Sequence, residues 1–556
     1  MHRYLRSIIL LSVTIALFSA CSREPDHMRY VPKDAVVVAG INMKSLSKKI
    51  AWNVITGSKL FQEMQKRIPE KNAVSGLENA GIDVSNSFYV YVKTDNRYKG
   101  GNRITGLVPL SDAGAWEAYV KQAFPNVEIK QQGDRKEASL GRDMYVGWNK
   151  KLLIVINVMS VSADNAGETE GNNSGPKVNV SSAMDKTDAS AEMDSAFSVR
   201  TENSILGNNR FTGLEKEDHD VIFWLNYDQL MTQYMSSNMG EKMGVSLSNT
   251  LWKDAAFTAG FDFKKGKITG DMRYYMPDAM KEIGDSLGST NADKEMIERL
   301  PLQNMDMLFA MHLSPKGVKA MLEKAGFLGL ANVGLSTQGM SVDNVLDAFT
   351  GDMAILMSDF SLKTESVTDS FMGQAVVHQN QKPSLSMSYV MKINKKDDFQ
   401  KIVQLAKNVG LVPMKDGYFL PLDEKDSVYM LMNDQYVVLS NKYPNASGFL
   451  QGEYKAQKMP EALTPAVLGN PMAFYFDVQQ FLKNIDPAIS HSAHDSAMIV
   501  ESKMLLNNIS ITGGAFKNNA FESHLDINFI NTEENSIIEL MDFGMRMSDA
   551  DKISSK

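Results

Sequence analysis

The sequence predicts an α+β protein made of two tandem copies of one module, each with a mainly antiparallel sheet and helices packed on one face. Three observations predict it. Short apolar runs lead directly into helical patterns, pairs of apolar segments are joined by tight turns, and both kinds of segment recur in the same order in the two halves of the chain. Strands joined by short turns pair antiparallel, which leaves one sheet face free for solvent.

Four segments carry the pattern of a buried strand that feeds a helix. Each has five or six apolar residues, then a polar residue, and then the beginning of a helical period. The first is VVVAGI at 36–41, which ends at Asn42. The others lie at 221–230, 307–318 and 472–482, and their polar residues are Asn226, His312 and Asp477. Recurrence on this scale favours an internal duplication.

The spacing of matching blocks locates extra residues in the first copy. The hairpin turns at Asn149 and Asn433 are 284 residues apart, and we expect tight turns there because Asn tolerates positive φ. The later junctions at Asn226 and Asp477 are only 251 residues apart. Residues 159–205 are rich in Ser, Asn, Asp, Gly and Ala and lack a hydrophobic period, so they predict a flexible insertion.

These boundaries divide the mature chain into two large copies rather than the three or four domains that 556 residues would allow at about 150 residues per domain. Thr532 is the expected N-cap of a short terminal helix. The segments are a tether at 21–30, the first copy at 31–277, a helical connector at 278–300, the second copy at 301–530, and a C-terminal helix and tail at 531–556.

The N-terminus predicts a signal peptide over residues 1–20. Arg3 and Arg6 form its positive region, and the apolar stretch 8–18 is too short to span a bilayer, which needs about 20 residues. Cys21 follows Ser-Ala directly, and this arrangement resembles the lipobox of bacterial lipoproteins, in which a lipid is attached to the cysteine. The alternative is an ordinary secretory peptide with an incidental cysteine.

The same resemblance bears on localisation. Ser22 stands where an Asp retains enterobacterial lipoproteins at the inner membrane, so we expect an outer-membrane lipoprotein held by its N-terminal lipid. Its periplasmic or surface-exposed orientation stays open.

Composition excludes several classes of protein. Cys21 is the only cysteine, so the chain has no internal disulfide and no thiolate zinc cluster. The formal net charge is −8, from 58 Lys and Arg against 66 Asp and Glu, which argues against a nucleic-acid partner. The 36 methionines fall within apolar strands and helices, which favours core filling over a copper site.

Four sequence features together resemble an uncharacterised family of Bacteroidota lipoproteins, catalogued only as a domain of unknown function. They are the lipobox, the opening VPKDAVVVAGINMKSL, the block DAFTGDMAILMSD at 347–359 and the ending NTEENSIIEL. The resemblance covers nearly the whole mature chain. It implies an envelope protein and carries no catalytic residues.

Few residues suggest chemistry. His491, His494 and Asp495 form the one tight histidine group, and they are weak candidates for a metal site because the stretch 486–497 reads as an exposed loop. We expect no cofactor. Ser195 and Ser496 each follow an Asp and precede an apolar residue, which resembles the O-glycosylation acceptor of Bacteroidota.

Two classes of function remain. The leading interpretation is a lipid-anchored binding or assembly module without catalysis, with an envelope protein or a glycan as partner. The alternative is a hydrolase-type envelope enzyme that uses carboxylates in a cleft between the copies. Its candidate acids are the pairs Asp343 with Asp347 and Asp397 with Asp398.

Overall fold

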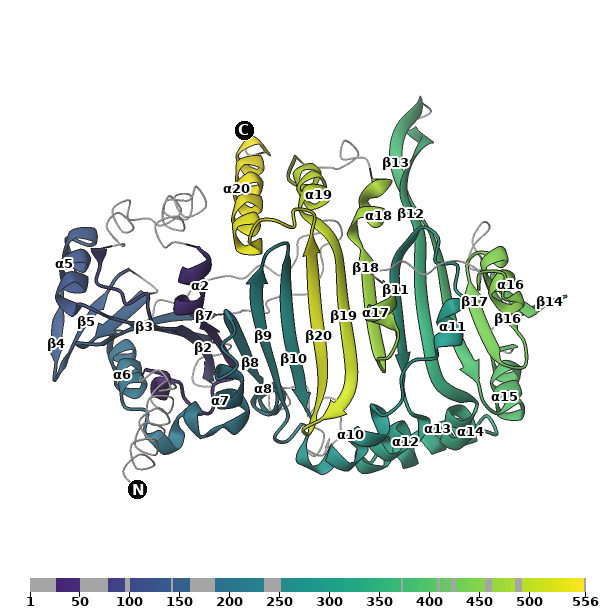
Figure 1. Cartoon of the computed structure of the whole chain (residues 1–556), viewed down its shortest axis with the longest axis horizontal. Coiled ribbons are helices and arrows are strands. Elements are labelled where there is room, and N and C mark those ends of the chain that lie inside the picture. Colours follow the sequence, from purple (N-terminus) through teal and green to yellow (C-terminus); the bar gives the residue numbers. More distant parts are fainter. Residues whose placement is uncertain are drawn as a thin grey trace, which may run out of the picture. The chain divides into compact units, whose positions relative to one another are not determined.

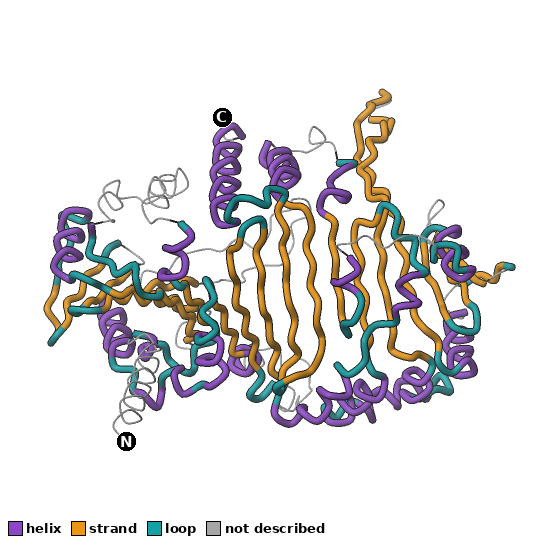
Figure 2. The backbone as a smooth tube through the Cα atoms, viewed as in Figure 1, coloured by secondary structure: helices purple, strands orange, loops and turns teal. Residues whose placement is uncertain are grey.

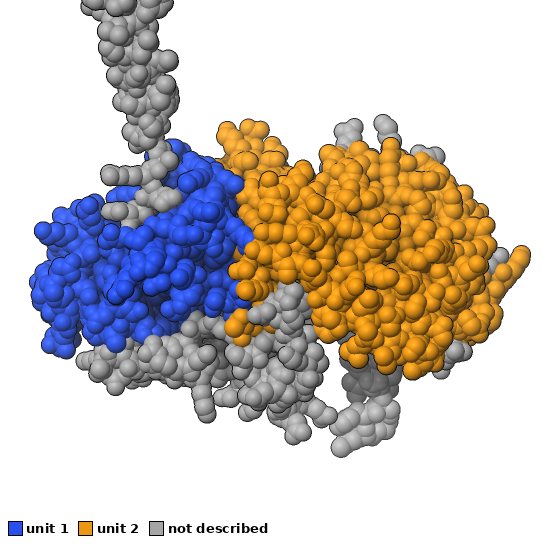
Figure 3. Space-filling model, turned by 90° about the horizontal axis from the view of Figure 1, so that it is seen from below, with its two compact units in different colours: residues 1–230, 258–261 blue, residues 231–257, 262–556 orange. Residues whose placement is uncertain are grey.

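The structure is a computed structural model. The structure describes residues 27–50, 79–95, 101–141, 144–160, 186–234, 252–371, 374–407, 411–415, 417–421, 427–455, 463–485 and 493–554. The chain forms two compact units, coloured separately in Figure 3. Unit 1 comprises Met1–Leu230 and Thr258–Phe261, and unit 2 comprises Met231–Phe257 and Asp262–Lys556.

The expected mixture of helices with a mainly antiparallel sheet is confirmed (Figure 2). The strand pairs of unit 1 follow the order β4-β5-β6-β7-β3-β2-β1-β8, and each is antiparallel. The strands are β1 (Val37–Ile41), β2 (Phe88–Asp95), β3 (Gly101–Pro109), β4 (Lys130–Gln132), β5 (Arg135–Ser139), β6 (Met144–Trp148), β7 (Leu152–Ser160) and β8 (Val221–Asn226).

Aromatic side chains dominate the core of unit 1. Trp116 and Tyr119 of α5 lie buried with their rings 5.3 Å apart and pack with Trp148 of β6 and Leu153 of β7. The residues at i and i+3 share one face of α5, which is why this helix covers the sheet. The helices are η1 (Met28–Tyr30), α2 (Met43–Lys49), α5 (Ala113–Ala123), α6 (Lys186–Phe197), η3 (Thr201–Asn203), η4 (Ile205–Gly207), α7 (Asn209–Glu215) and α8 (Tyr227–Tyr234), which continues into unit 2.

In unit 2 the antiparallel order is β14-β15-β16-β17-β13-β12-β11-β18-β19-β20-β10. Its longest strands, β12 and β13, stay paired to their shared tip. The strands are β9 (Ala256–Lys264, partly in unit 1), β10 (Lys267–Tyr275), β11 (Met305–His312), β12 (Phe349–Phe371), β13 (Gln374–Ile393), β14 (Val412–Met414), β15 (Gly417–Pro421), β16 (Ser427–Met432), β17 (Tyr436–Ser440), β18 (Met472–Asp477), β19 (Leu506–Lys517) and β20 (Ala520–Phe529).

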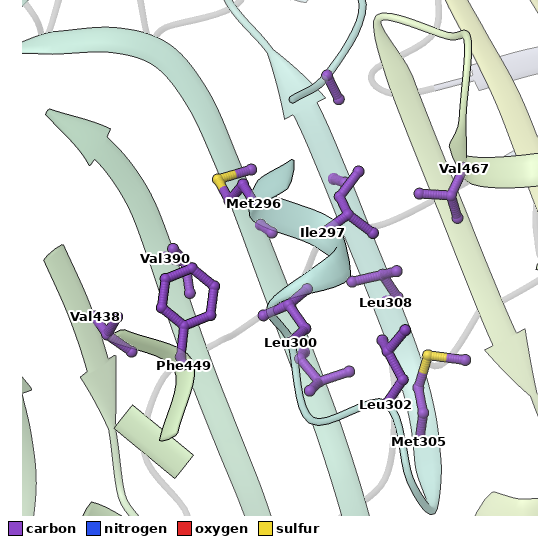
Figure 4. Packing of buried hydrophobic residues seen from close by; sticks show 14 of the residues in the cluster. Met296, Ile297, Leu300, Leu302, Met305, Leu308, Val390, Val438, Phe449 and Val467 are labelled. Carbon is purple, nitrogen blue, oxygen red and sulfur yellow. The ribbon is translucent and has the colours of Figure 1, made fainter. Parts of the chain in front are cut away.

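The largest core of unit 2 lies beneath α11, α16 and α17. Met296, Ile297 and Leu300 point from α11 and the turn after it toward Leu308 and Val390 of the sheet (Figure 4). Other helices lie at the ends of the strands rather than on a face (Figure 1). The helices are η7 (Asp278–Met280), α10 (Lys281–Leu287), α11 (Lys294–Glu298), α12 (Pro315–Lys324), α13 (Leu328–Ser336), α14 (Val342–Asp347), α15 (Lys396–Lys407), α16 (Tyr443–Gln451), α17 (Leu463–Val467), α18 (Val478–Lys483), α19 (Ala493–Leu505) and α20 (Ser536–Ser554).

The polar residues after the four recurring strands cap helices, with one exception. The side-chain oxygen of Asn42 accepts from Ser45 N at 3.0 Å, and that of Asp477 accepts from Gln480 N at 2.9 Å. Asn226 makes the same contact in α8. His312 does not cap a helix, because Ser314 is the N-cap of α12 and His312 still belongs to the strand.

The tight turns at Asn149 and Asn433 use a different mechanism from the one expected. Neither residue has positive φ. Instead, the Asn149 side-chain oxygen accepts from the backbone of residues 151 and 152 at 2.9 Å, and Asn433 accepts from residues 435 and 436 at the same distance. These are Asx turns, in which the side chain replaces a backbone acceptor.

Two expectations about local order are wrong in part. Residues 186–197 of the predicted flexible insertion form α6, because Met193 is fully buried and gives this polar segment a packing anchor. The terminal helix begins at Ser536 rather than after Thr532, because Asn535 accepts from Ile537 N at 3.1 Å and a bridge to Lys265 holds the preceding residues non-helical.

The compact units do not coincide with the copies expected from the sequence. β10 belongs to the first copy in sequence, yet it pairs along its whole length with β20 in unit 2. Backbone hydrogen bonding therefore assigns the end of the first copy to the second unit. Among the described residues, no helix is both long and apolar enough to cross a membrane.

Candidate functional site

Helix α6 lies on the sheet of unit 1 and forms one wall of a pocket in that unit. Met193 anchors the helix and is fully buried against β6. A Cβ atom at Gly147 would lie only 2.6 Å from the Met193 sulfur, so the glycine leaves the space that the Met193 side chain fills. The contact between Met193 and Gly147 lets α6 pack close to β6.

A buried carboxylate ties α6 to strands β5 and β6. Glu137 is 1% exposed and accepts hydrogen bonds from Arg135 Nε at 2.7 Å, Tyr145 OH at 2.7 Å and Ser190 Oγ at 3.1 Å. Burial, reinforced by this carboxylate, raises the pKa of Tyr145, so its hydroxyl stays a donor. Arg135 also pairs with Asp194 of α6. The helix is thus held by charge as well as by Met193.

The pocket beneath α6 has a volume of about 390 Å³, within the usual range for small-molecule sites. Its wall combines charged residues with apolar ones such as Ile156 and Val199. Arg103 of β3 is 5% exposed and forms an ion pair with Glu192 of α6. At the rim, Lys93 Nζ lies 2.8 Å from Asp34 Oδ2. The pocket therefore presents groups of both signs, each held in place by a partner.

Tyr91 stands beside these pairs on β2. Burial raises its pKa to about 12, and the nearby carboxylates of Glu192 and Asp34 act in the same direction, against a hydrogen bond with Thr105. Its hydroxyl is therefore neutral at physiological pH. The arrangement can hold a polar ligand by hydrogen bonds and charge.

A second, more open pocket in unit 1 has a volume of about 960 Å³. It is lined by His27, Asp83 and the turn around Lys150 and Lys151. His27 Nε2 lies 2.6 Å from the Ser87 carbonyl oxygen, and its ring lies 5.4 Å from that of Tyr89. The imidazole is thus engaged in fixing the chain before β2.

Unit 2 contains a His–Asp pair across neighbouring strands. His312 Nδ1 donates to Asp352 Oδ1 at 2.9 Å, and Thr350 Oγ1 donates to Asp352 Oδ2 at 2.7 Å. Burial alone would raise the pKa of Asp352, but these hydrogen bonds outweigh it and hold the pKa below its ordinary value. In the described part of the chain, no hydroxyl is recorded at hydrogen-bond distance from the other nitrogen of His312, so a catalytic triad is not assembled there.

Replacing Asp352→Asn should make the protein less stable by about 1–3 kcal/mol at pH 7, because the charged acceptor of two hydrogen bonds is lost. A carboxylate with a lowered folded pKa stabilises above its unfolded pKa of about 3.9, and this stabilisation is lost as the pH falls through the folded value. Urea unfolding at pH 7 and near pH 3 measures it. The difference from the wild type should shrink in acid, whereas the exposed control Asp434→Asn should change little at either pH. A difference independent of pH would contradict the assignment.

The sequence-predicted metal group is not assembled in the described residues. Cys21 and His491 lie outside them. His494 and Asp495 belong to the first turn of α19, so this part of the expected loop is helical. Packing against α20 stabilises the helix. Asp495 is exposed. Among the described residues, no group of three or more His, Cys, Asp or Glu side chains could hold a metal ion.

The two predicted glycosylation serines both lie on helices. Ser195 is exposed on α6 at the pocket wall, and Ser496 is half-buried on α19. Modification of either stays a prediction.

Three of the four candidate catalytic acids of unit 2, Asp343, Asp347 and Asp398, each pair with a lysine, and Asp397 stands beside Asp398 in the first turn of α15. Asp343 Oδ1 lies 2.6 Å from Lys319 Nζ, and Asp347 Oδ2 lies 2.6 Å from Lys395 Nζ. Lysine hydrogen bonds accordingly lower the pKa of Asp398, which Lys401 contacts at 2.8 Å. Each of these three paired carboxylates is a surface or helix-end charge with its own partner rather than one of a catalytic pair.

Sequence reasoning missed the charged groups of the α6 pocket. The available signal was weak, since Arg103 is one charged residue in β3, a strand that is otherwise uncharged. A charge on the buried face of a strand indicates a buried partner. For Arg103 that partner is Glu192 of α6, a helix that lies within the expected flexible insertion.

Comparisons with known proteins give no family. No family model and no curated protein matches the chain. Among solved structures, crystal forms III and I of a protein named TP0453 match with 12% identity and a TM-score of 0.24, covering 46% of this chain and 81% and 79% of theirs. Crystal form IV matches with 11% identity and a TM-score of 0.25, covering 48% of this chain and 87% of that one. Similarity at this level carries no argument about function.

Proposed function

We propose that the chain is a lipid-anchored protein of the bacterial outer membrane that binds another envelope component and performs no catalysis. Its proposed relatives are the Bacteroidota lipoproteins that the sequence resembles. The partner is an envelope protein or a glycan, and the ligand-binding surface is the pocket beneath α6. No cofactor is part of this proposal.

The observation that supports binding is the organisation of the α6 pocket. Its volume of about 390 Å³ accommodates a small polar group, such as one sugar unit or a short peptide segment. The Arg103–Glu192 and Lys93–Asp34 pairs preorganise hydrogen-bonding groups on its wall. Preorganised polar groups lower the cost of ordering a site when a ligand binds.

We further propose that the two α+β copies arose by duplication. The first eight strands of unit 1 pair in the order β4-β5-β6-β7-β3-β2-β1-β8. In unit 2, the order β14-β15-β16-β17-β13-β12-β11-β18 is the same with each number raised by ten. The Asx turns at Asn149 and Asn433 occupy matching positions in these orders. Shared strand order and shared turn chemistry support a common origin.

Photo-crosslinking in cells tests the proposed binding role. A photoreactive residue at Val199, on the pocket wall, should capture a reproducible envelope protein or glycan. The same residue at Asp434, whose side chain is 81% exposed in a turn of unit 2, is the control and should not capture that partner. Recovery of identical adducts from both positions, or of none from Val199, would contradict the proposed site.

The proposed anchor gives a separate prediction. Cys21→Ala should move the protein from the membrane fraction to the soluble fraction after cell lysis, because removing the acylated residue removes every buried acyl CH₂, each worth about 0.8 kcal/mol. Ser22→Ala keeps the cysteine and serves as the control. Sedimentation followed by immunoblotting measures the distribution. Unchanged membrane association of Cys21→Ala would rule out Cys21 as the main anchor.

A further inference from the structure

Helix α13 in unit 2 exposes apolar side chains that no described element covers. Leu330 and Val333 are 68% and 67% exposed, the highest values among the exposed large hydrophobic residues. They lie at i and i+3 and so share one face of the helix. A Cβ atom at either Gly329 or Gly334 would meet no atom within 4 Å. The exposed face of α13 therefore projects into open space.

The surroundings of α13 hold it in this position. α12, α13 and α14 lie side by side at one end of the strands of unit 2 (Figure 1). Gly326, at φ +79°, allows the sharp turn between α12 and α13, and Gly339, at φ +68°, allows the turn toward α14. Asn332 Oδ1 accepts from Val342 N at 2.9 Å and ties α13 to the start of α14. These turns and this hydrogen bond therefore hold α13 in a defined position with its apolar face exposed.

Charge distribution distinguishes the classes of partner. The 18 residues from 325 to 342 contain no charged side chain. The preceding helix α12 carries Lys316, Lys319 and Lys324 against one acid, Glu323, although the whole chain has a net charge of −8. Lys319 is paired with Asp343 of α14, so Lys316 and Lys324 remain to meet headgroups. An uncharged apolar projection bordered by lysines matches the interface of an anionic lipid bilayer, where apolar side chains enter the acyl boundary and lysines meet the headgroups.

We propose that α13 inserts its exposed face shallowly into the surface of a lipid bilayer, with Lys316 and Lys324 of α12 at the headgroups. A nine-residue helix is about 14 Å long and cannot span the hydrocarbon core, so insertion stays interfacial. A convex projection also suits a fluid surface, since it needs no complementary groove. This membrane contact is additional to the proposed lipid at Cys21.

The chain offers a clean probe because Cys21 is its only cysteine. The full chain without residues that precede Cys21, carrying Cys21→Ala, has neither a thiol nor an acyl chain. Leu330→Cys in this background takes an environment-sensitive dye at α13. Met504→Cys, on α19 at 52% exposure, is the matched control. Vesicles of phosphatidylglycerol and phosphatidylethanolamine should shift the emission of the dye at 330 to shorter wavelength and leave the dye at 504 unchanged.

Vesicle sedimentation gives the affinity. In the Cys21→Ala background, Leu330→Glu with Val333→Glu should weaken partitioning at least ten-fold, and Met498→Glu with Met504→Glu should not. Circular dichroism should show that both variants are folded. Absence of an emission shift together with absence of sedimentation would overturn the proposal. If adding unlabelled protein without vesicles shifts the emission of the dye at 330, the proposal is also overturned. A second copy of the chain would then be the occupant of this face. Because the tested variants carry Cys21→Ala, a failure to bind vesicles would contradict only the membrane contact of α13 and not the proposed anchoring at Cys21.

Discussion

Glu137→Ala should lower the free energy of unfolding of unit 1 by about 3–5 kcal/mol, the usual cost of breaking a buried ion pair by removing one partner. Glu137 is 1% exposed and accepts from Arg135, Tyr145 and Ser190. Truncation leaves the Arg135 guanidinium, itself largely buried, with only Asp194 of α6 as its carboxylate partner among the described residues. The same change removes a tie between α6 and the sheet, so the α6 pocket should open.

Urea unfolding followed by tryptophan fluorescence measures this effect, because Trp116 and Trp148 lie in the core that β5 and β6 share. Glu137→Gln keeps an acceptor for Tyr145 and Ser190 and should cost less than the alanine. Hydrogen exchange should show α6 deprotected in Glu137→Ala and protected in the glutamine variant. Equal stability of both variants would mean that the carboxylate charge and its hydrogen bonds do not hold α6.

Phe449→Ala should destabilise unit 2 by about 3–5 kcal/mol, which is typical for deleting a fully buried aromatic ring. Phe449 of α16 is 1% exposed and meets the ring of Tyr436 edge to face, with centroids 5.3 Å apart at 90°. Tyr436 is itself fully buried and has Arg299 over its ring at 5.4 Å. The alanine variant therefore loses a ring pair and leaves a cavity between α16 and β17 (Figure 4).

Far-UV circular dichroism is the suitable probe for this variant, since Trp116, Trp148 and Trp224 report on unit 1. Met387→Ala, at 49% exposure on β13, is the control and should change stability by less than about 0.5 kcal/mol. Phe449→Leu should recover part of the loss because it refills some of the cavity. A loss below about 1 kcal/mol for Phe449→Ala would show that the packing between α16 and the sheet is not as the structure describes.

Local patterns predicted the elements well where the determining interactions are local. The runs at 36–41 and 472–482 became β1 and the β18–α18 junction because apolar residues of strand period are followed by a side chain able to cap a helix. The positions of the turns at Asn149 and Asn433 were right even though their mechanism was not. A side chain that can satisfy nearby backbone groups marks such a turn whatever its φ.

Local patterns failed where a segment is ordered by distant contacts. The sequence of α6 is polar and lacks a hydrophobic period. The helix forms because Met193 packs against Gly147 and because Asp194 and Glu192 form ion pairs with arginines of the sheet. α19 likewise contains residues expected in a loop and is completed by packing against α20. These partners cannot be read from the neighbouring sequence, since Arg135 lies 59 residues from Asp194 and Arg546 lies 45 residues from Glu501.

The sequence by itself determined the α+β composition, the antiparallel hairpins, the strand-to-helix junctions and the prediction of a lipid at Cys21, because each depends on hydrophobic period, capping chemistry or a short motif. Only the tertiary structure decided that β10 pairs with β20, that α6 covers a charged pocket, and that α13 leaves Leu330 and Val333 exposed. The physical reason is common to all three. Strand partners, buried ion pairs and the exposure of an apolar helix are properties of contacts between residues far apart in sequence, and an apolar pattern alone is the same whether the side chain faces a core or solvent.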